Sequence, residues 1–165
     1  MKYHKQEHLY APEIGMKGSC YPTVLACLLD LELHDVPYFH LFYWTTGEKR
    51  NLNKVFRNRY LDNKPEEECQ ENQRCNYHHA ISLADGLWDI VLKTWLAAQG
   101  YEETFVKEDS QLDTSMPYLV SGISVRGIEH VVIYQGGKMI HDPHPSNDGL
   151  VKPKEHYPYS YLKKI

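Results

Sequence analysis

The sequence predicts an α+β protein, in which helices come first along the chain and antiparallel strands follow. Two stretches, about residues 19–34 and 83–99, repeat apolar side chains at helical spacing, and short apolar or alternating runs follow residue 100. Helices that precede strands, rather than alternate with them, are typical of the α+β class. A length of 165 residues suits one domain, so we expect a single domain over residues 1–165.

The first helix is expected to begin after Ser19 and to end near His34. Ser19 is a favoured N-cap residue, and Pro22 fits the first turn, where its missing N–H is not needed. The residue before Pro37 is biased away from helical geometry, so the helix should have ended by then. Apolar residues recur at helical spacing along this stretch: Val24, Leu25, Leu28 and Leu31.

The second helix is predicted over residues 83–99, with Ser82 as its N-cap and Gly100 as its C-terminal stop. Its apolar stripe consists of Leu83, Leu87, Trp88, Val91, Leu92, Trp95 and Leu96. Between the two helices, an aromatic cluster at residues 38–44 is expected in the core. It is followed by a polar insertion over residues 45–80 that carries charges of both signs.

Four strands are predicted after residue 100, at residues 103–106, 117–120, 130–134 and 138–141. The third has the strongest pattern, with Val131, Val132 and Ile133 at its centre. Gly136 and Gly137 turn the chain into the fourth strand. The remainder is rich in Pro, His and Tyr, and we expect an extended tail on the surface.

The composition excludes several classes of function. Hydrophobic residues make up 42% and charged residues 24% of the chain, and a net charge of −4 offers no basic field for phosphates, so we expect no nucleic-acid partner. No apolar run has the roughly 18 residues needed to span a membrane. Residues 1–8 have no apolar run behind their charges and do not resemble a secretory signal. We therefore expect a cytoplasmic protein with reduced thiols.

Cys20 is the first candidate for chemistry because it lies at the predicted N-terminus of a helix. The helix dipole and the unpaired N–H groups of the first turn favour a thiolate, and the same N–H groups can receive an oxyanion. The alternative is a structural cysteine, since free cysteine is among the most buried residue types. Cys27 lies seven residues on, along the apolar face, and fits that structural role. Cys69 and Cys75 lie in a polar stretch and are assigned no role.

His130 opens the strongest strand and Asp142 follows the next one, so the turn between the strands decides whether the two side chains meet. A two-residue turn at residues 136–137 would point Asp142 to the face opposite His130. A three-residue loop that includes Gln135 would place His130 opposite Asp142. The simpler roles are a strand-end histidine bonded to backbone and a turn aspartate before a proline. The spacing is compatible with a contact and does not establish one.

Taken together, a helix-borne Cys, a late strand that opens with His and an Asp on the next strand resemble the papain-like cysteine peptidase superfamily. The segments His130–Tyr134, Gly136–Lys138 and Ile140–Pro143 are similar to the His and Asp-Pro strands of bacteriocin-leader-processing peptidases. The segments Gly18–Thr23 and Ser121–Gly127 resemble small papain-like proteins of bacteria and phages. Such motif matches are hypotheses until geometry supports them.

The resemblance implies a papain-like fold, with the N-terminal Cys-bearing helix packed on the C-terminal antiparallel sheet. It implies a cysteine peptidase or amidase that needs no cofactor and acts on a peptide or amide substrate. Cys20 would be the nucleophile, His130 the general base and Asp142 the orienting acid of a catalytic triad that forms a thioester.

The oxyanion donor is the part of the family pattern that this chain lacks. Papain-like enzymes usually supply a side-chain donor, often Gln, about six residues before the Cys. Here that position is Ile14, and Gln6 lies further away. The donor is left open between a backbone N–H, Lys17 and none.

Two other functions remain open. A catalytically inactive papain-like module that binds a peptide or protein would explain a missing oxyanion donor. A metal-dependent hydrolase would use His141, Asp142 and His144, which offer three possible ligands within four residues. Solvated and capping histidines are the simpler explanation of this run. The sequence indicates no oligomeric state.

Overall fold

The computed structural model describes residues 1–10, 18–37 and 89–165. The chain divides into two compact units, one made of Met1–Tyr38 with Leu96–Ile165 and the other of Phe39–Trp95. The first unit holds the sheet and Cys20. The polar insertion predicted at residues 45–80, the aromatic cluster at 38–44 and two of the cysteines lie outside the described residues.

The first helix, α1 (Cys20–Leu29), begins where the sequence predicts and ends earlier than His34. Asp30 adopts a left-handed φ of 61°. Its N–H bonds the carbonyl of Cys27, and the N–H of Leu31 bonds that of Ala26. This pair of bonds is a Schellman motif, which ends a helix even when Asp takes the place of the usual glycine. A single 3-10 turn, η2 (Leu33–Asp35), follows instead of a continued helix.

Residues 89–98 form a second helix, and the part predicted at 83–88 lies outside the described residues. Leu92 and Leu96 of the predicted apolar stripe are buried, at 2% and 1% exposure. The helix stops at Gly100, whose φ of 82° is the left-handed conformation that a C′ glycine supplies.

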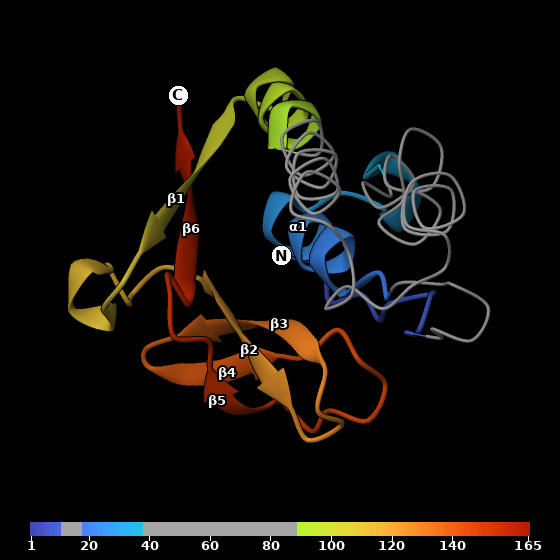
Figure 1. Ribbon diagram of the computed structural model, residues 1–165. Coiled ribbons are helices and arrows are strands. Elements are labelled where there is room, and N and C mark those ends of the chain that lie inside the picture. Colours follow the sequence, from blue (N-terminus) through green and yellow to red (C-terminus); the bar gives the residue numbers. More distant parts are fainter. Residues whose placement is uncertain (11–17, 38–88) are drawn as a thin grey trace, which may run out of the picture. The chain divides into compact units, whose positions relative to one another are not determined.

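Six antiparallel strands form one sheet, which confirms the α+β class (Figure 1). The strands are β1 (Tyr101–Val106), β2 (Tyr118–Ser124), β3 (Glu129–Gln135), β4 (Lys138–His141), β5 (Leu150–Pro153) and β6 (Tyr159–Lys164). A 3-10 turn, η4 (Asp109–Gln111), separates β1 from β2. The order across the sheet is β1-β6-β2-β3-β4, and β5 also pairs with β2.

The prediction of an extended surface tail after Asp142 is wrong, because this segment contains β5 and β6. Strand β6 lies between β1 and β2, and Ser160, its second residue, is buried. Tyr159 and Tyr161 flank Ser160 and point together into one hydrophobic cluster. This is the period-2 alternation of a strand, with the aromatic residues that strands favour. The prolines around it obscured that signal.

Within the described part of the chain, two core clusters alternate along the central strands. One contains Val24, Cys27, Leu119, Val131 and Ile133, from α1, β2 and β3. The other contains Tyr118, Val120 and Val132, from β2 and β3. Because neighbouring residues of a strand point to opposite faces, both faces of β2 and β3 are covered. His130 is therefore held by a strand that is buried on both sides.

Gly122 allows β5 to approach β2 closely. A Cβ atom at this position would lie only 2.2 Å from the carbonyl oxygen of Lys152. Any side chain here would push β5 away from β2, so glycine is required at this crossing.

The turn between β3 and β4 has the two residues of one predicted register, but it places Asp142 on the face predicted by the other, the three-residue loop. Gln135 pairs with Lys138, so the turn has two residues, and both glycines have positive φ as type I′ turns require. A bulge then follows, because Tyr134 pairs with Met139 whereas Ile133 pairs with His141. The extra residue, Ile140, shifts the alternation of side chains in β4 by one position. One step beyond β4, Asp142 therefore falls on the same face as His130.

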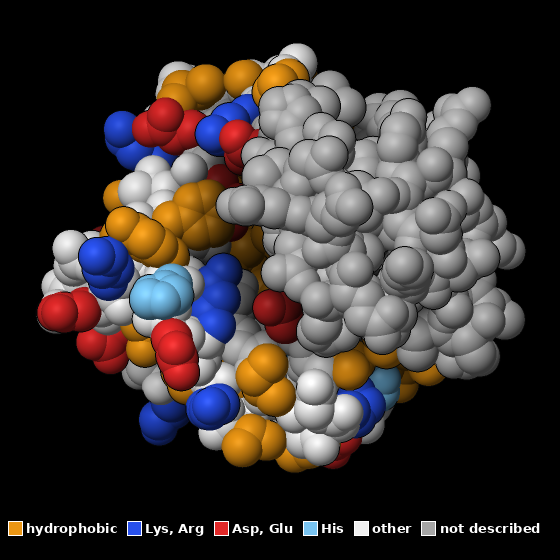
Figure 2. Space-filling model, viewed as in Figure 1, with side chains coloured by type: hydrophobic (Ala, Val, Ile, Leu, Met, Phe, Trp, Pro, Cys, Tyr) orange, Lys and Arg blue, Asp and Glu red, His pale blue; other side chains and the backbone are white. Residues whose placement is uncertain are grey.

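The surface of the described residues carries charges of both signs. Figure 2 shows acidic and basic side chains interspersed over the described part of one face. Among the described residues, no helix is long and apolar enough to cross a membrane.

Candidate active site

His130 and Asp142 form a buried ion pair at one end of the sheet. The imidazole Nε2 lies 2.7 Å from Asp142 Oδ1, and the two side chains are 2% and 0% exposed. His130 is the second residue of β3, and Asp142 directly follows β4. The contact that the sequence spacing allowed but did not establish is present. The two-residue turn, which alone would have separated the side chains, is compensated by the bulge in β4.

The carboxylate of Asp142 is held by backbone as well as by the imidazole. The N–H of His144 donates to Oδ1 at 2.7 Å, and the N–H of Gly149 donates to Oδ2 at 2.8 Å. Burial raises the pKa of Asp142, but the bond to His130 and these two N–H groups lower it from 3.8 to about 2. The carboxylate is therefore ionised at neutral pH and fixed in direction, as a residue that orients an imidazole must be.

Two acceptors flank the ring of His130 and raise its pKa. Burial lowers its pKa, but hydrogen bonds to Asp142 and to the Cys20 side chain, together with the negative charge of both partners, raise it from 6.5 to about 9. Since Nε2 faces Asp142, the ring nitrogen left for Cys20 is Nδ1. The ring thus lies between the carboxylate of Asp142 and the side chain of Cys20.

Cys20 and Cys27 are both on α1, and their surroundings differ. Cys20 is the first residue of the helix and is partly exposed, whereas Cys27 is buried at 0% exposure in the core cluster. The N–H of His4 donates to Cys27 Sγ at 3.3 Å, and burial raises the pKa of the Cys27 thiol. Cys27 therefore has the structural role that its position predicts. Of the two cysteines on α1, Cys20 is the one that a reagent can reach.

The start of α1 leaves a backbone donor beside the thiol. Ser19 occupies the N-cap position without capping the helix, because its Oγ accepts the N–H of His8 at 3.1 Å. The N–H of Ser19 bonds the His8 carbonyl, and Pro22 has no N–H. Among the described residues, the N–H of Cys20 has no acceptor. An oxyanion formed at the thiol could use it.

The N-terminal segment, residues 1–10, connects the helix to the loop that follows β4. The Gln6 N–H donates to the Pro143 carbonyl at 2.8 Å. The Nζ of Lys5 donates to the carbonyls of Asp142 and His144, at 2.6 and 3.1 Å. Sequence reasoning gave no role to Lys5 and left Gln6 unassigned, because an irregular segment has no periodicity that would reveal its partners.

The side chain of Gln6 lies beside the backbone that leads into Cys20. It is buried, its Nε2 donates to the His8 carbonyl at 3.2 Å, and its Oε1 is buried with no partner among the described residues. A Cβ atom on Gly18 would lie 3.6 Å from Nε2. Gln6 is thus brought close to the residue two positions before the candidate nucleophile, although it is far from it in sequence.

The residues of the metal-site hypothesis do not converge. His141 Nε2 bonds the His4 carbonyl at 2.7 Å, Asp142 bonds His130, and His144 Nδ1 bonds Ser146 Oγ at 2.6 Å. Over the described ranges of the chain, no three His, Cys, Asp or Glu side chains are placed to hold a metal ion.

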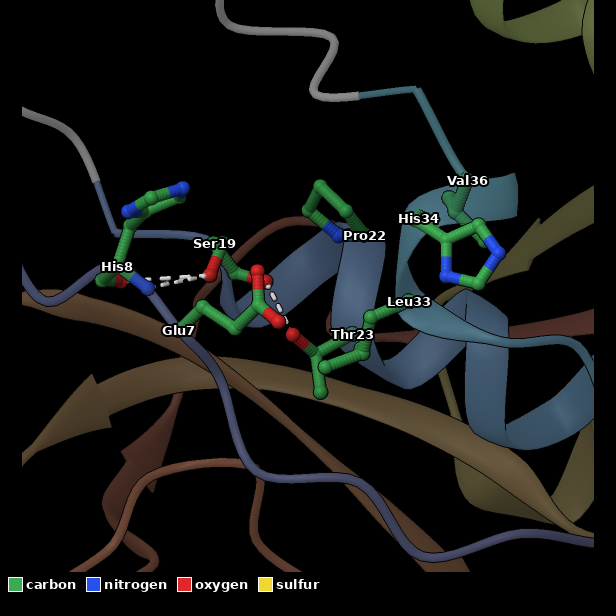
Figure 3. A pocket seen from close by; sticks show the side chains of 8 residues that line it. All are labelled: Glu7, His8, Ser19, Pro22, Thr23, Leu33, His34 and Val36. Atoms are coloured by element: carbon green, nitrogen blue, oxygen red, sulfur yellow. Dashed lines mark hydrogen bonds between the residues drawn. The ribbon is translucent and has the colours of Figure 1, made fainter.

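A pocket of about 180 Å³ lies next to the start of α1. Figure 3 shows its eight lining residues, which are Glu7, His8, Ser19, Pro22, Thr23, Leu33, His34 and Val36. Its central hydroxyl groups already have partners, since Thr23 Oγ1 donates to the Ser19 carbonyl at 2.8 Å and Ser19 Oγ is bonded to His8. None of Cys20, His130 and Asp142 lines it, so this pocket is not the candidate active site.

The chain shows no significant match to any family model, curated protein or solved structure with which it was compared.

Proposed function

We propose that the protein is a thiol hydrolase, a cysteine peptidase or amidase with a papain-like arrangement of Cys20, His130 and Asp142. The observation that carries the proposal is the imidazole of His130, which lies between the buried carboxylate of Asp142 and the side chain of Cys20 with its pKa raised to about 9. A histidine with this pair of partners is suited to hold a thiolate–imidazolium pair.

The reaction would proceed by acyl transfer. The Cys20 thiolate attacks the carbonyl carbon of a peptide or amide and forms a C–S bond, and the carbonyl electron pair moves to oxygen. The imidazolium of His130 gives its proton to the leaving amine as the C–N bond breaks, which leaves a thioester. Water then attacks the thioester, His130 takes its proton, and the acid is released as the thiol re-forms.

Two N–H donors are available for the oxyanion. The N–H of Cys20 lies at the helix N-terminus, where the dipole also favours negative charge. Gln6 supplies the side-chain amide beside Gly18, in place of the glutamine that papain-like enzymes carry nearer to their cysteine. The inactive-module alternative rested on a missing side-chain donor, and the position of Gln6 weakens it.

The architecture supports the same assignment. Val24 and Cys27 of α1 share a core cluster with Val131 and Ile133 of β3. The helix that carries the nucleophile would thereby be held against the strand that carries the base. This corresponds to the papain-like layout of a Cys-bearing helix on an antiparallel sheet.

The test is the pH dependence of iodoacetamide labelling at Cys20, read by peptide mass spectrometry in the wild type and in His130→Ala. A free cysteine titrates near pH 8.5, roughly, and a His-paired one far lower. We expect rapid labelling of Cys20 at pH 6 that slows by about a hundredfold in His130→Ala. Cys27 is buried in the same helix and serves as the internal control, since its labelling reports unfolding.

The pKa shifts of His130 and Asp142 define the pH range in which this ion pair stabilises the fold. The pKa of His130 is raised, so the stability it contributes is complete below pH 6.5 and is lost as the pH rises through about 9. The pKa of Asp142 is lowered, so its contribution is present above pH 3.8 and is lost as the pH falls through about 2. Labelling of Cys20 only above pH 8, at the same rate in both proteins, would overturn the proposal and favour the binding module.

A further inference from the structure

Arg126 and His144 lie at the same end of the sheet as His130. Arg126 is in the turn between β2 and β3, and His144 is in the loop between β4 and β5. Because β2, β3 and β4 are antiparallel neighbours, both connections lie at the end where β3 begins (Figure 1). The imidazole of His144 stands perpendicular to that of His130, with ring centroids 6.2 Å apart.

The hydrogen bonds of Ser146 define the tautomer of His144. The Ser146 N–H donates to His144 Nδ1 at 3.1 Å, so Nδ1 is an acceptor. The Ser146 hydroxyl, 2.6 Å from the same nitrogen, then also donates to it and accepts in turn from Arg126 Nη1 at 3.2 Å. The proton of the neutral ring is therefore on Nε2. Burial and the charge of Arg126 lower the pKa of His144, which agrees with a neutral ring.

Two N–H donors of Arg126 and His144 have no acceptor among the described residues. Arg126 Nε is buried without a partner among the described residues, and in the same part of the chain no acceptor faces Nε2–H of His144. The nearest anion to the guanidinium is Asp148, whose Oδ2 lies 3.7 Å from Nη1 and whose side chain is 41% exposed. Lys5, the other nearby cation, already bonds two carbonyls and Asn147.

We infer that Arg126 and His144 form a subsite for a carboxylate group of the substrate. A guanidinium presents paired donors that match a carboxylate, and the imidazole N–H of His144 adds a third donor. The carboxylate would belong to an acidic side chain or to a free C-terminus close to the bond that is cleaved. The inference rests on the proposed function, because it assigns the substrate class of that same site.

The test compares matched alkylating peptides that differ only in charge. Iodoacetyl-Gly-Asp amide is compared with iodoacetyl-Gly-Asn amide, and iodoacetyl-Gly-Gly acid with its carboxamide. In each, the Cys20 thiolate forms a C–S bond as iodide leaves with the bonding pair. We expect the acidic member of at least one pair to react about tenfold faster at pH 6.5. The first pair reports a side-chain carboxylate, and the second a terminal one.

Three variants separate recognition from a structural role. Arg126→Gln should remove the acid preference by slowing the acidic probes far more than neutral iodoacetamide, and Arg126→Lys should restore part of the preference. Asp148→Asn should increase the preference severalfold, since it removes the competing carboxylate. Equal rates within both pairs in the wild type would overturn the inference. An Arg126→Gln protein that slows acidic and neutral probes alike would also overturn it, because Arg126 would then only join the two loops.

A second measurement keeps the inference independent of the reactive thiol. In Cys20→Ser, the ring resonances of His144 are followed by NMR while acetyl-Gly-Asp amide, acetyl-Gly-Asn amide and acetyl-Gly-Gly acid are added. A saturable shift with an acidic peptide, absent with the neutral one and in Arg126→Gln, supports the subsite. No shift with either acid contradicts it. Slow labelling by every reagent at pH 6, including iodoacetamide, would instead identify a failure of the proposed function.

Discussion

The candidate site has two halves that differ in burial and in hydrogen bonding. The buried half consists of His130 and Asp142, and both oxygens of its carboxylate are hydrogen-bonded. The open half contains Cys20, which is partly exposed, and has polar groups without a hydrogen-bond partner. The carboxylate of Asp142 has three hydrogen-bond partners, and the residue is 1% exposed. Across the described segments, the N–H of Cys20 and the Oε1 of Gln6 have no partner. The buried half fixes the direction of the base, and the other half keeps donors and acceptors for a ligand.

The difference follows from what a charged side chain and a nucleophile each require of their surroundings. A buried charge is tolerated only when it is paired and hydrogen-bonded, so the Asp142 carboxylate needs strands and backbone N–H groups around it. A nucleophile must meet its substrate, so it lies at a helix end with exposed surface. Substitutions in the buried half should therefore change the orientation of His130, and substitutions in the open half should change contacts with added ligands.

The largest effect is expected from Asp142→Asn, which breaks the buried half. The amide keeps the size of the side chain but removes the charge that helps to hold the proton on His130. We expect the pKa of His130, measured by NMR titration, to fall back toward 6.5, and iodoacetamide labelling of Cys20 at pH 6 to slow by roughly a hundredfold.

Asp148→Asn is the matched control for this change. Asp148 is an exposed carboxylate in the same loop, and it has no contact with His130. The control should leave the iodoacetamide rate unchanged, which separates the orienting role of Asp142 from the general charge of the loop. If Asp142→Asn labelled as fast as the wild type while remaining folded, the buried half would be structural only.

A smaller effect, specific to the open half, is expected from Gln6→Leu. A dipeptide aldehyde forms a hemithioacetal with the thiol, and its oxygen occupies the place of the oxyanion, whereas alkylation by iodoacetamide forms no oxyanion. We expect Gln6→Leu to weaken inhibition by the aldehyde by roughly tenfold or more, with an unchanged alkylation rate.

Gln6→Glu provides the comparison, since it keeps the length of the side chain and replaces the donor by an acceptor. It should weaken aldehyde inhibition at least as much as Gln6→Leu. Equal loss of aldehyde inhibition and of alkylation in Gln6→Leu would indicate that Gln6 supports the fold and does not contact the oxyanion.

The sequence predicted the regular parts of the molecule because their signals are periodic. The apolar spacing of α1 and the Val131–Ile133 run of β3 identified the two elements that carry Cys20 and His130. Strand β6 was missed because prolines and tyrosines surround it, and the pairing of Tyr159 with Val106 and Val120 is long-range. No local rule indicates such a partner.

The site was predicted in its residues but not in how they are brought together. The His130–Asp142 contact depends on a bulge at Ile140, and neither of the two simple turn registers contained that bulge. Ser19 was expected to cap α1 and instead bonds His8. That bond and those of Gln6 draw an irregular segment along the start of the helix. Contacts of this kind depend on the tertiary structure, so spacing in the sequence could not reveal them.

The smallest effect is expected from Lys5→Met, which acts on the connection between the two halves. The ammonium of Lys5 bonds the carbonyls of Asp142 and His144 and the side chain of Asn147, so it holds the loop that carries the orienting carboxylate. These groups are partly accessible to water, which can replace the lost bonds, so we expect the free energy of unfolding to fall by only about 1 kcal/mol.

The rate of Cys20 labelling at pH 6 should fall a few-fold in Lys5→Met, because a looser loop holds His130 less firmly. Aldehyde inhibition should decline to the same extent as alkylation. Lys2→Met is the matched control. Lys2 belongs to the same segment but pairs with Glu32 at 2.6 Å on the surface, away from the loop. Denaturant unfolding and labelling are measured on both variants. If Lys2→Met and Lys5→Met behaved alike, the loop would hold Asp142 in place without the ammonium. The buried half would then owe its order to the backbone N–H groups of His144 and Gly149 alone.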